Sequence, residues 1–376
     1  MQKKAAFVVL GTVLMVIIVA VTLVLTVGPR TSAATPEDYD DVKVTMGTVN
    51  QTGYLAVDTA SGTLHGLSEA GKYYVAQVDA YRVIVPDNVK VIDNDAFAQD
   101  TRLKAVVLSH SVTRIMHGAF QGCTQLTAVN IPASVNFLGS YAFADCVNLA
   151  TMKVDPSNSV FTSQSGAGVE INGIIKRAEH SLVAGCQSTV IPAEVTSIGA
   201  YAFKGQANLT TIDIPDSVTI LENNAFAQCS GLKTVNGMMN VATISSSAFV
   251  DCTNLSTIVF GNKLTSIGCA AFKNCTQLTK IVVPDNVTTI KGYAFANTPL
   301  KRVTITDGVQ TIEQGAFANC KNLKQIKIPA SVTVMGAGVF AGGDLKELDF
   351  VGTALLDTWS TDWQQDCNAN VVFVNE

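Results

Sequence analysis

Ten phenylalanines recur at a nearly constant spacing, and this spacing limits the folds open to the chain more than any other feature. Consecutive members lie about 23 residues apart, a period typical of solenoid proteins, except across one longer interval between Phe143 and Phe203. They stand at positions 97, 120, 143, 203, 226, 249, 272, 295, 317 and 340. One full unit, LTKIVVPDNVTTIKGYAFANT, runs from residue 278 to residue 298. The general form is L-x-x-I-x-I-P-x-x-V-x-x-I-x-x-x-A-F-x-x-C, and stacked copies of such a unit indicate a solenoid.

Each unit has the pattern of one coil of such a solenoid. Alternate β-branched residues, such as Ile281 and Val283, predict a short strand with these side chains pointing inward. Pro284 then ends the strand, because proline has no backbone N–H for a ladder. One coil cannot bury its apolar side chains alone, so we expect stacked copies that share a core.

The same pattern resembles the leucine-rich repeats of the BspA-like type. Other segments that carry it are IPAEVTSIGAYAF (191–203), IPDSVTILENNAF (214–226) and IPASVTVMGAGVF (328–340). The resemblance covers residues 82–350 and implies an α/β horseshoe-like solenoid. Its short parallel strands would form one long sheet, opposite an irregular or short-helical convex side. For function, the resemblance implies a surface protein used in adhesion.

Two segments depart from the repeat inside the solenoid. The long interval between Phe143 and Phe203 holds one unit plus an extra segment, whose glycines and short apolar runs predict a hairpin insertion at about residues 155–189. Insertions in repeat proteins often fall on the binding face. At residues 237–239, Gly-Met-Met replaces the usual Ile-Pro, so we expect the least regular strand there.

Both ends of the solenoid need caps that cover the terminal coils. Residues 42–81 are expected to form the N-terminal cap, with a hairpin around Ser61-Gly62. Residues 351–376 are expected to form a helical C-terminal cap. Four of its residues are each four positions apart, which places them on one helical face: Leu355, Trp359, Trp363 and Cys367.

The N-terminus predicts a membrane anchor. Residues 5–27 are uncharged, and this run is longer than the apolar stretch of a cleavable signal peptide and long enough to span a bilayer. Lys3 and Lys4 precede this span and an acidic linker, residues 28–41, follows it, so residues 1–27 would form a cytoplasmic tip and signal-anchor with the remainder outside the cell. Cleavage near Ala33-Ala34, which would give a secreted protein, is the alternative.

Composition and motifs argue against several functions. The net charge of −5 and the 15% of charged residues include no basic run, so no nucleic-acid partner is expected. The four histidines form no metal-ligand pattern and occupy no repeated position, and His117 is expected in a surface loop. No phosphate loop, dinucleotide fingerprint or nucleophile elbow occurs. We therefore expect no catalytic residue, metal, cofactor or small-molecule substrate.

Six of the nine cysteines stand three residues after a repeat phenylalanine. At equivalent positions in stacked coils their side chains point in the same direction, which disfavours disulfides and predicts buried thiols. The set is Cys123, Cys146, Cys229, Cys252, Cys275 and Cys320. Three cysteines, Cys186, Cys269 and Cys367, lie outside this row and are expected to react first with thiol reagents.

The outward positions of the strands are the candidate site for an extracellular protein ligand. The residues that alternate with the inward apolar side chains are mostly small or Thr-rich, with a basic strip at about residues 280–327. The candidate binding residues are Lys153, Asp213, Lys280, Arg302, Lys327, Glu347 and Asp349. A structural envelope protein without a ligand is the alternative, and a carbohydrate-binding or hydrolytic protein using Trp359 and Trp363 is a more distant one.

Overall fold

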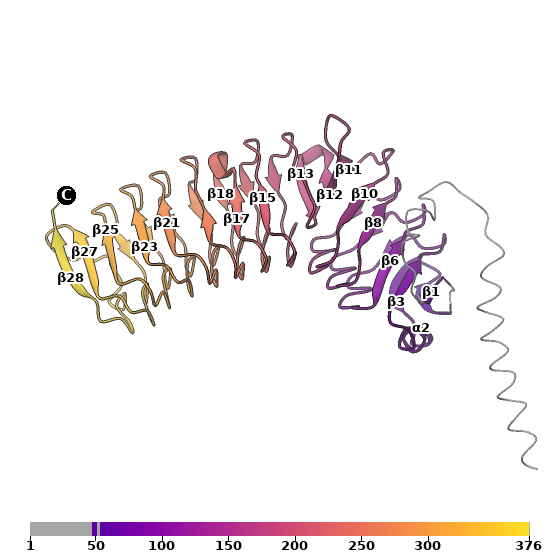
Figure 1. Cartoon of the computed structure of the whole chain (residues 1–376), viewed down its shortest axis with the longest axis horizontal. Helices are drawn as coiled ribbons and strands as arrows, with labels where there is room; N and C mark the ends of the chain where they lie inside the picture. Colours follow the sequence, from indigo (N-terminus) through magenta and orange to yellow (C-terminus); the bar gives the residue numbers. More distant parts are fainter. Residues whose placement is uncertain (1–46, 51–52, 376) are drawn as a thin grey trace, which may run out of the picture. The chain divides into compact units, whose positions relative to one another are not determined.

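The computed structural model describes residues 47–50 and 53–375, which all fall in one compact unit, Val44–Glu376. This unit is a solenoid of about 13 turns stacked in chain order, with very little helix (Figure 1). The strands of its first side are β1 (Gly47–Val49), β4 (Tyr81–Ile84), β6 (Leu103–Val107), β8 (Ala128–Ile131), β10 (Thr151–Val154), β15 (Thr211–Asp213), β17 (Thr234–Asn236), β19 (Thr257–Ile258), β21 (Lys280–Val283), β23 (Arg302–Ile305), β25 (Gln325–Ile328), β27 (Glu347–Val351) and β28 (Asn370–Val374). The predicted leucine-rich-repeat solenoid is confirmed.

A second side consists of very short strands, where an irregular or short-helical side was expected. Except across the insertion, each pairs in parallel with the same strand of the neighbouring turn, as Thr289 does with Thr311. These strands are β5 (Val91–Ile92), β7 (Arg114–Ile115), β9 (Phe137–Leu138), β14 (Ser197–Ile198), β16 (Ile220–Leu221), β18 (Thr243–Ile244), β20 (Ser266–Ile267), β22 (Thr289–Ile290), β24 (Thr311–Ile312) and β26 (Val334–Met335). Glycine often follows them, because the preceding turn passes very close: a Cβ on Gly268 would lie 2.5 Å from the Ser245 carbonyl carbon.

The expected single long sheet is wrong for the first side. Its strands fall into five separate sheets, which end between β6 and β8, β10 and β15, β19 and β21, and β23 and β25. The longest sheet, with ten strands, runs instead through the second side from β14 to β26 and continues into the insertion. The outward residues of the first side therefore stand on a discontinuous surface.

The segment between β10 and β14 contains three antiparallel strands. β11 (Phe161–Gln164) pairs with β12 (Glu170–Lys176), a 3-10 turn η2 (Arg177–Glu179) follows, and β12 pairs with β13 (Ser181–Gly185). β13 then pairs in parallel with β14, which joins the segment to the second side. The irregularity expected at residues 237–239 is a short 3-10 helix, η3 (Met238–Asn240), that follows β17.

The core of the stack is a row of parallel phenylalanine rings. Phe203, Phe226 and Phe249 lie with ring centroids 4.9 and 5.2 Å apart, and the planes of successive rings are inclined by only 9° and 2°. The row continues to Phe340, and a second row joins Phe97, Phe120 and Phe143. The buried apolar residues correspondingly form two clusters, one on each side of the insertion.

The position two residues after each repeat phenylalanine has a positive φ, as at Asp251, Asn274 and Asn297 (60°, 64° and 60°). Asparagine, aspartate and glycine tolerate this left-handed conformation better than other residues, which explains their recurrence here. The side chains also join the turns: Asn274 Nδ2 donates to Asp251 Oδ1 over 2.6 Å, and Asn297 Nδ2 donates to Asn274 Oδ1 over the same distance.

All six cysteines of the repeat row are buried free thiols, as predicted. Each donates a hydrogen bond to the carbonyl of the phenylalanine in the preceding turn, as Cys252 does to Phe226 over 3.0 Å. Burial raises the pKa of these thiols, to about 12 for Cys146 and about 11 for Cys320. Outside the row, Cys186 and Cys367 are also buried, so only Cys269 is exposed.

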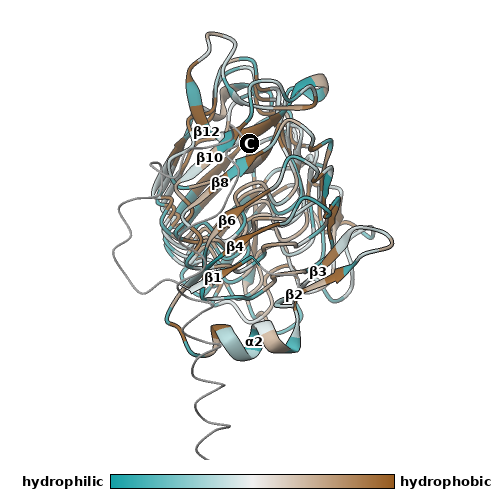
Figure 2. Cartoon of the chain, turned by 90° about the vertical axis from the view of Figure 1, so that its right-hand side faces the viewer, coloured by the Kyte–Doolittle hydropathy of each residue, from teal (hydrophilic) through white to brown (hydrophobic). Residues whose placement is uncertain are grey.

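The N-terminal turns are covered by a hairpin of β2 (Leu55–Asp58) and β3 (Thr63–Leu67), followed by a short helix, α2 (Glu69–Val75). Figure 2 looks along the stack from this end and shows α2 next to β1 and the hairpin. Ser68 caps the helix, because its side chain accepts a hydrogen bond from the Gly71 N–H over 3.1 Å.

The helical C-terminal cap is wrong. Residues 357–366 form turns, and β28 then adds a strand parallel to β27. Trp359 and Trp363 are nevertheless buried, with their rings edge-to-face at 5.6 Å, and Trp359 Nε1 donates to the Val332 carbonyl over 3.2 Å. The four-residue spacing correctly predicted that Trp359, Trp363 and Cys367 are buried. Leu355 is exposed, because the turns do not share one helical face.

The predicted anchor, residues 5–27, and the linker that follows it lie outside the described residues. Within residues 47–50 and 53–375, no helix is long and apolar enough to cross a membrane.

Candidate protein-binding face

The candidate binding residues project from the first side of the solenoid, where strand alternation separates them from the core. In β21 and β23, Lys280 and Arg302 are exposed, whereas their neighbours Ile281 and Val303 are buried. Lys280 and Arg302 stand directly opposite each other in the parallel register of these two strands. The predicted basic strip therefore begins with two cations on adjacent strands.

Lys327 stands on β25, opposite Asp349 of β27, and Glu347 stands opposite Gln325. Gln325 Nε2 donates to both carboxylates, over 2.6 Å to Glu347 Oε1 and 2.9 Å to Asp349 Oδ2. Five of the seven predicted residues thus lie on four consecutive strands, β21 to β27.

Lys153 and Asp213 do not join this group. Lys153 lies on β10 and Asp213 lies on β15, with the insertion between these strands. Asp213 accepts a hydrogen bond from Asn236 Nδ2 of the next turn over 2.7 Å. These two residues share the face with the others but not the local site.

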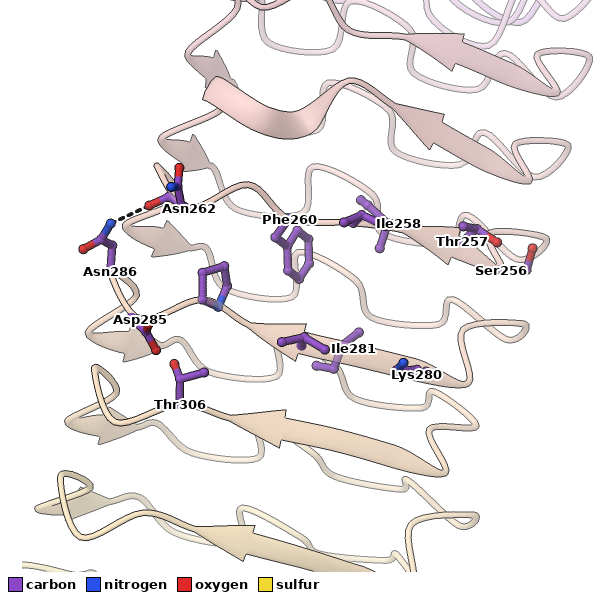
Figure 3. A pocket seen from close by; sticks show the side chains of 13 residues that line it. Ser256, Thr257, Ile258, Phe260, Asn262, Lys280, Ile281, Asp285, Asn286 and Thr306 are labelled. Carbon is purple, nitrogen blue, oxygen red and sulfur yellow. Dashed lines mark hydrogen bonds between the residues drawn. The ribbon is translucent and has the colours of Figure 1, made fainter.

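One hollow on this face, with a volume of about 910 Å³, coincides with the sheet break between β19 and β21. Figure 3 shows Phe260 between the two strands, with Lys280 near one end of the hollow and Asp285 near the other. Phe260 is half-buried and packs against Phe272, with 5.5 Å between the ring centroids. Val259 and Val282 line the same hollow and are 66% and 47% exposed.

The break has a visible cause in the sequence. Phe260 and Gly261 replace the usual Ile-Pro, and β19 spans only Thr257–Ile258. Gly261 passes beside η3 of the previous turn, where an added Cβ would lie 2.1 Å from the Met239 carbonyl oxygen. The backbone therefore leaves the regular path, and a larger aromatic ring occupies the strand end.

A second hollow, of about 760 Å³, coincides with the break between β23 and β25. Four cationic side chains line it, together with Asp349. They are Lys301, Arg302, Lys324 and Lys327. Lys324 is paired with Asp344, which also pairs with Lys346, and these hydrogen bonds lower the pKa of Asp344 to about 2.

Phe260, Lys301 and Lys324 were not predicted as site residues. Phe260 occupies a position that is inward in every regular turn. The replacement of Ile-Pro by Phe-Gly was the available signal. The lysines precede the first outward residue of their strands, and only the structure shows that they border a hollow.

Among the described residues, the other candidate functional side chains do not come together in a site. His117 is half-buried, and its Nδ1 accepts a hydrogen bond from the Ser140 N–H of the next turn over 3.0 Å. In the part of the chain that the structure describes, no group of three or more potential ligands could hold a metal ion. Trp359 and Trp363 are buried, so the expectation that they form a surface platform for sugars is wrong.

Short parallel strands, one repeat per turn and an exposed row of variable residues define a leucine-rich-repeat solenoid protein. A family model described as the BspA type leucine-rich repeat region, with six copies, matches residues 68–176, 157–266, 180–290 and 242–368. The chain therefore belongs to the BspA-type leucine-rich-repeat family, as the sequence pattern predicted.

Solved structures that resemble this chain include bacterial proteins. The pneumococcal vaccine antigen PcpA is 17% identical, with a TM-score of 0.53, over 78% of this chain and 68% of that one. A leucine-rich cell surface protein of Faecalibacterium prausnitzii is 23% identical, with a TM-score of 0.43, over 72% of this chain and 60% of that one. A leucine-rich repeat protein of Bacteroides ovatus is 18% identical, with a TM-score of 0.46, over 87% and 92%. A comparison with curated proteins finds no match.

Proposed function

We propose that this chain is a non-enzymatic extracellular protein that recognises proteins on host or neighbouring cells through the first side of its solenoid. The observation that carries the proposal is the exposed group on β21 to β27, where Lys280, Arg302 and Lys327 stand around two hollows. An exposed, charged and hollowed surface on a rigid repeat scaffold is typical of a recognition surface.

The location is part of the proposal. The apolar span at residues 5–27, with lysines before it and acidic residues after it, supports a single-pass anchor at the plasma membrane with the solenoid outside. Cleavage near Ala33-Ala34 would release the same solenoid as a secreted protein. Membrane fractionation followed by N-terminal sequencing distinguishes these two forms.

Charge reversal tests recognition directly. In the full chain, replacing Lys280, Arg302 and Lys327 together by glutamate should reduce binding to cells or extracellular matrix at least about tenfold, because three attractive charges become repulsive. The matched control reverses three lysines elsewhere, Lys72, Lys90 and Lys176, and should bind like the parent chain. Unchanged binding by the first variant would contradict the proposed face, and equal losses in both variants would indicate a non-specific charge effect.

A further inference from the structure

The two hollows of the first side differ in chemistry. The hollow between β19 and β21 is apolar at its centre, where Phe260, Val259 and Val282 meet solvent or lie half-buried. The three side chains form one apolar patch. Single apolar residues are common on protein surfaces, whereas a contiguous patch is typical of a contact site. The ring of Phe260 provides the aromatic anchor that is enriched in tight interfaces.

The hollow between β23 and β25 carries excess positive charge. Among the described residues, the side chains of Lys301, Arg302 and Lys327 have no acidic partner and no hydrogen bond. Asp349 is the one carboxylate in the lining, and it already accepts a hydrogen bond from Gln325. Three exposed cations around one hollow favour a ligand that carries carboxylates.

The two hollows are near neighbours. Their centres are separated by two strand positions, since β21 and β23 lie between β19 and β25. At about 4.8 Å per strand this corresponds to roughly 10 Å, the span of about three residues of extended polypeptide. Lys280 lines the apolar hollow and stands opposite Arg302 of the cationic one, so the positive charge is continuous between them.

We propose that the two hollows together bind one extended segment of a partner protein, with an apolar side chain at Phe260 and acidic side chains about three residues away at Arg302 and Lys327. This inference rests on the proposed function and specifies its partner as an acidic, extended peptide segment with one apolar anchor.

A uniform polyanion, such as a sulfated polysaccharide, fits this surface less well. Asp285 borders the apolar hollow, Asp349 borders the cationic hollow, and Asp307 shares a third hollow with Lys327. These carboxylates would repel an evenly charged chain, whereas a peptide can place neutral residues next to them. The apolar hollow would also gain nothing from a polysaccharide that lacks aliphatic side chains.

The test uses the full-length chain and fluorescently labelled synthetic peptides, with binding followed by anisotropy. The first peptide carries one leucine and, about three residues later, two aspartates in a glycine- and serine-rich sequence. In the second, asparagines replace the aspartates, and in the third, serine replaces the leucine. We expect the first peptide to bind, with each of the others at least about tenfold weaker, and we expect added salt to weaken the two peptides that carry aspartates more than the asparagine peptide.

Variants of the chain assign each part of the peptide to its hollow. Arg302→Glu should reduce binding of the first peptide about tenfold or more. Val282→Thr keeps a β-branched side chain at an exposed position and should reduce it about threefold to tenfold, but should leave the serine peptide unaffected. Lys90→Glu, an exposed position beside β5 of the second side and outside both hollows, is the control and should have no effect. Circular dichroism confirms that each variant remains folded.

Two results would overturn the inference. One is equal binding, or no binding, of all three peptides. The other is tight binding of heparin that Arg302→Glu abolishes and Val282→Thr does not change, which would assign the surface to polyanions. Failure of the peptides together with loss of cell binding in the triple charge-reversal variant would reject this inference and leave the proposed recognition function intact.

Discussion

The interior rows of the solenoid and the outward row of its first side share one repeat spacing, yet they vary in opposite ways. Inside, every regular repeat has the same phenylalanine, and most have the same cysteine or another hydrogen-bonding side chain. Outside, the residues change from threonine to lysine, valine, glutamine and glutamate along successive strands. The regular positions therefore maintain the stack, whereas the candidate binding residues stand at the outward positions and beside the turns where the pattern fails.

The largest difference between the two rows should appear on truncation of a core ring. Phe272 is fully buried between Phe249 and Phe295, at ring-centroid distances of 5.2 and 5.3 Å. Phe272→Ala should lower the free energy of unfolding by about 3–5 kcal/mol, through lost burial and a cavity. Val259→Ala on the outward row should change it by less than about 0.5 kcal/mol. Chemical denaturation measures both, and similar losses would contradict the comparison.

The thiol row should make stability depend on pH. Burial raises the pKa of Cys146 to about 12, above its ordinary value of about 9, so the folded state binds more protons than the unfolded state between these values. The free energy of unfolding should therefore fall as pH rises above about 9, by about 1.4 kcal/mol per pH unit for this thiol. Denaturation at pH about 8 and about 10 measures the fall, which should be smaller in Cys146→Ser.

Thiol labelling of the native protein checks the same row independently. Cys269 is exposed and should react first, whereas the six thiols of the row, Cys186 and Cys367 should stay protected until the chain unfolds. Rapid labelling of any row thiol in the native state would show that the turns open locally.

The left-handed positions should give an intermediate effect. Asn297 has a φ of 60° and links Asn274 to Asn319 through side-chain hydrogen bonds of 2.6 and 2.9 Å. Asn297→Val should cost about 1–2 kcal/mol, because a β-branched residue is strained at positive φ and the hydrogen bonds are lost. Asn297→Gly keeps the conformation and should cost less. Equal costs in thermal unfolding would show that the hydrogen bonds, and not the backbone, dominate.

A small effect on stability is also expected from the outward charges. Replacing Lys280, Arg302 and Lys327 by glutamate should change the free energy of unfolding by less than about 1 kcal/mol, because exposed charges contribute little to stability. The same variant should lose binding. A large destabilisation measured by calorimetry would mean that these outward residues also stabilise the fold, and would contradict the difference drawn between them and the interior.

The repeat predicted most of the fold, because a buried position accepts few residues and therefore leaves a periodic signal. The strand with Ile281 and Val283 and the buried row of Phe272 and Cys275 follow from that signal, and the N-terminal hairpin follows from the turn residues Ser61-Gly62. The very short strands of the second side were missed, since a pair of residues is too few to show alternation.

The candidate site was predicted less completely, because its shape depends on turns that break the rule. The exposed charges of Lys280 and Arg302 follow from strand alternation. The hollow beside Phe260 depends on how Gly261 passes η3, and the C-terminal cap depends on how Trp359 and Trp363 pack against the last turns. The replacement of Ile-Pro by Phe-Gly marks where the first irregularity lies, but neither arrangement can be derived from the local pattern alone.

The hydrogen bonds of the buried thiols bear on how such a chain can grow during evolution. Each thiol satisfies a carbonyl without needing a second cysteine, and Thr298 takes the same position by donating to the Phe295 carbonyl over 2.7 Å. A duplicated turn therefore adds a thiol that needs no disulfide partner. We expect the stack to tolerate oxidising and reducing surroundings alike. The length of the recognition surface is then free to change by whole turns, with no disulfide pairing to rearrange.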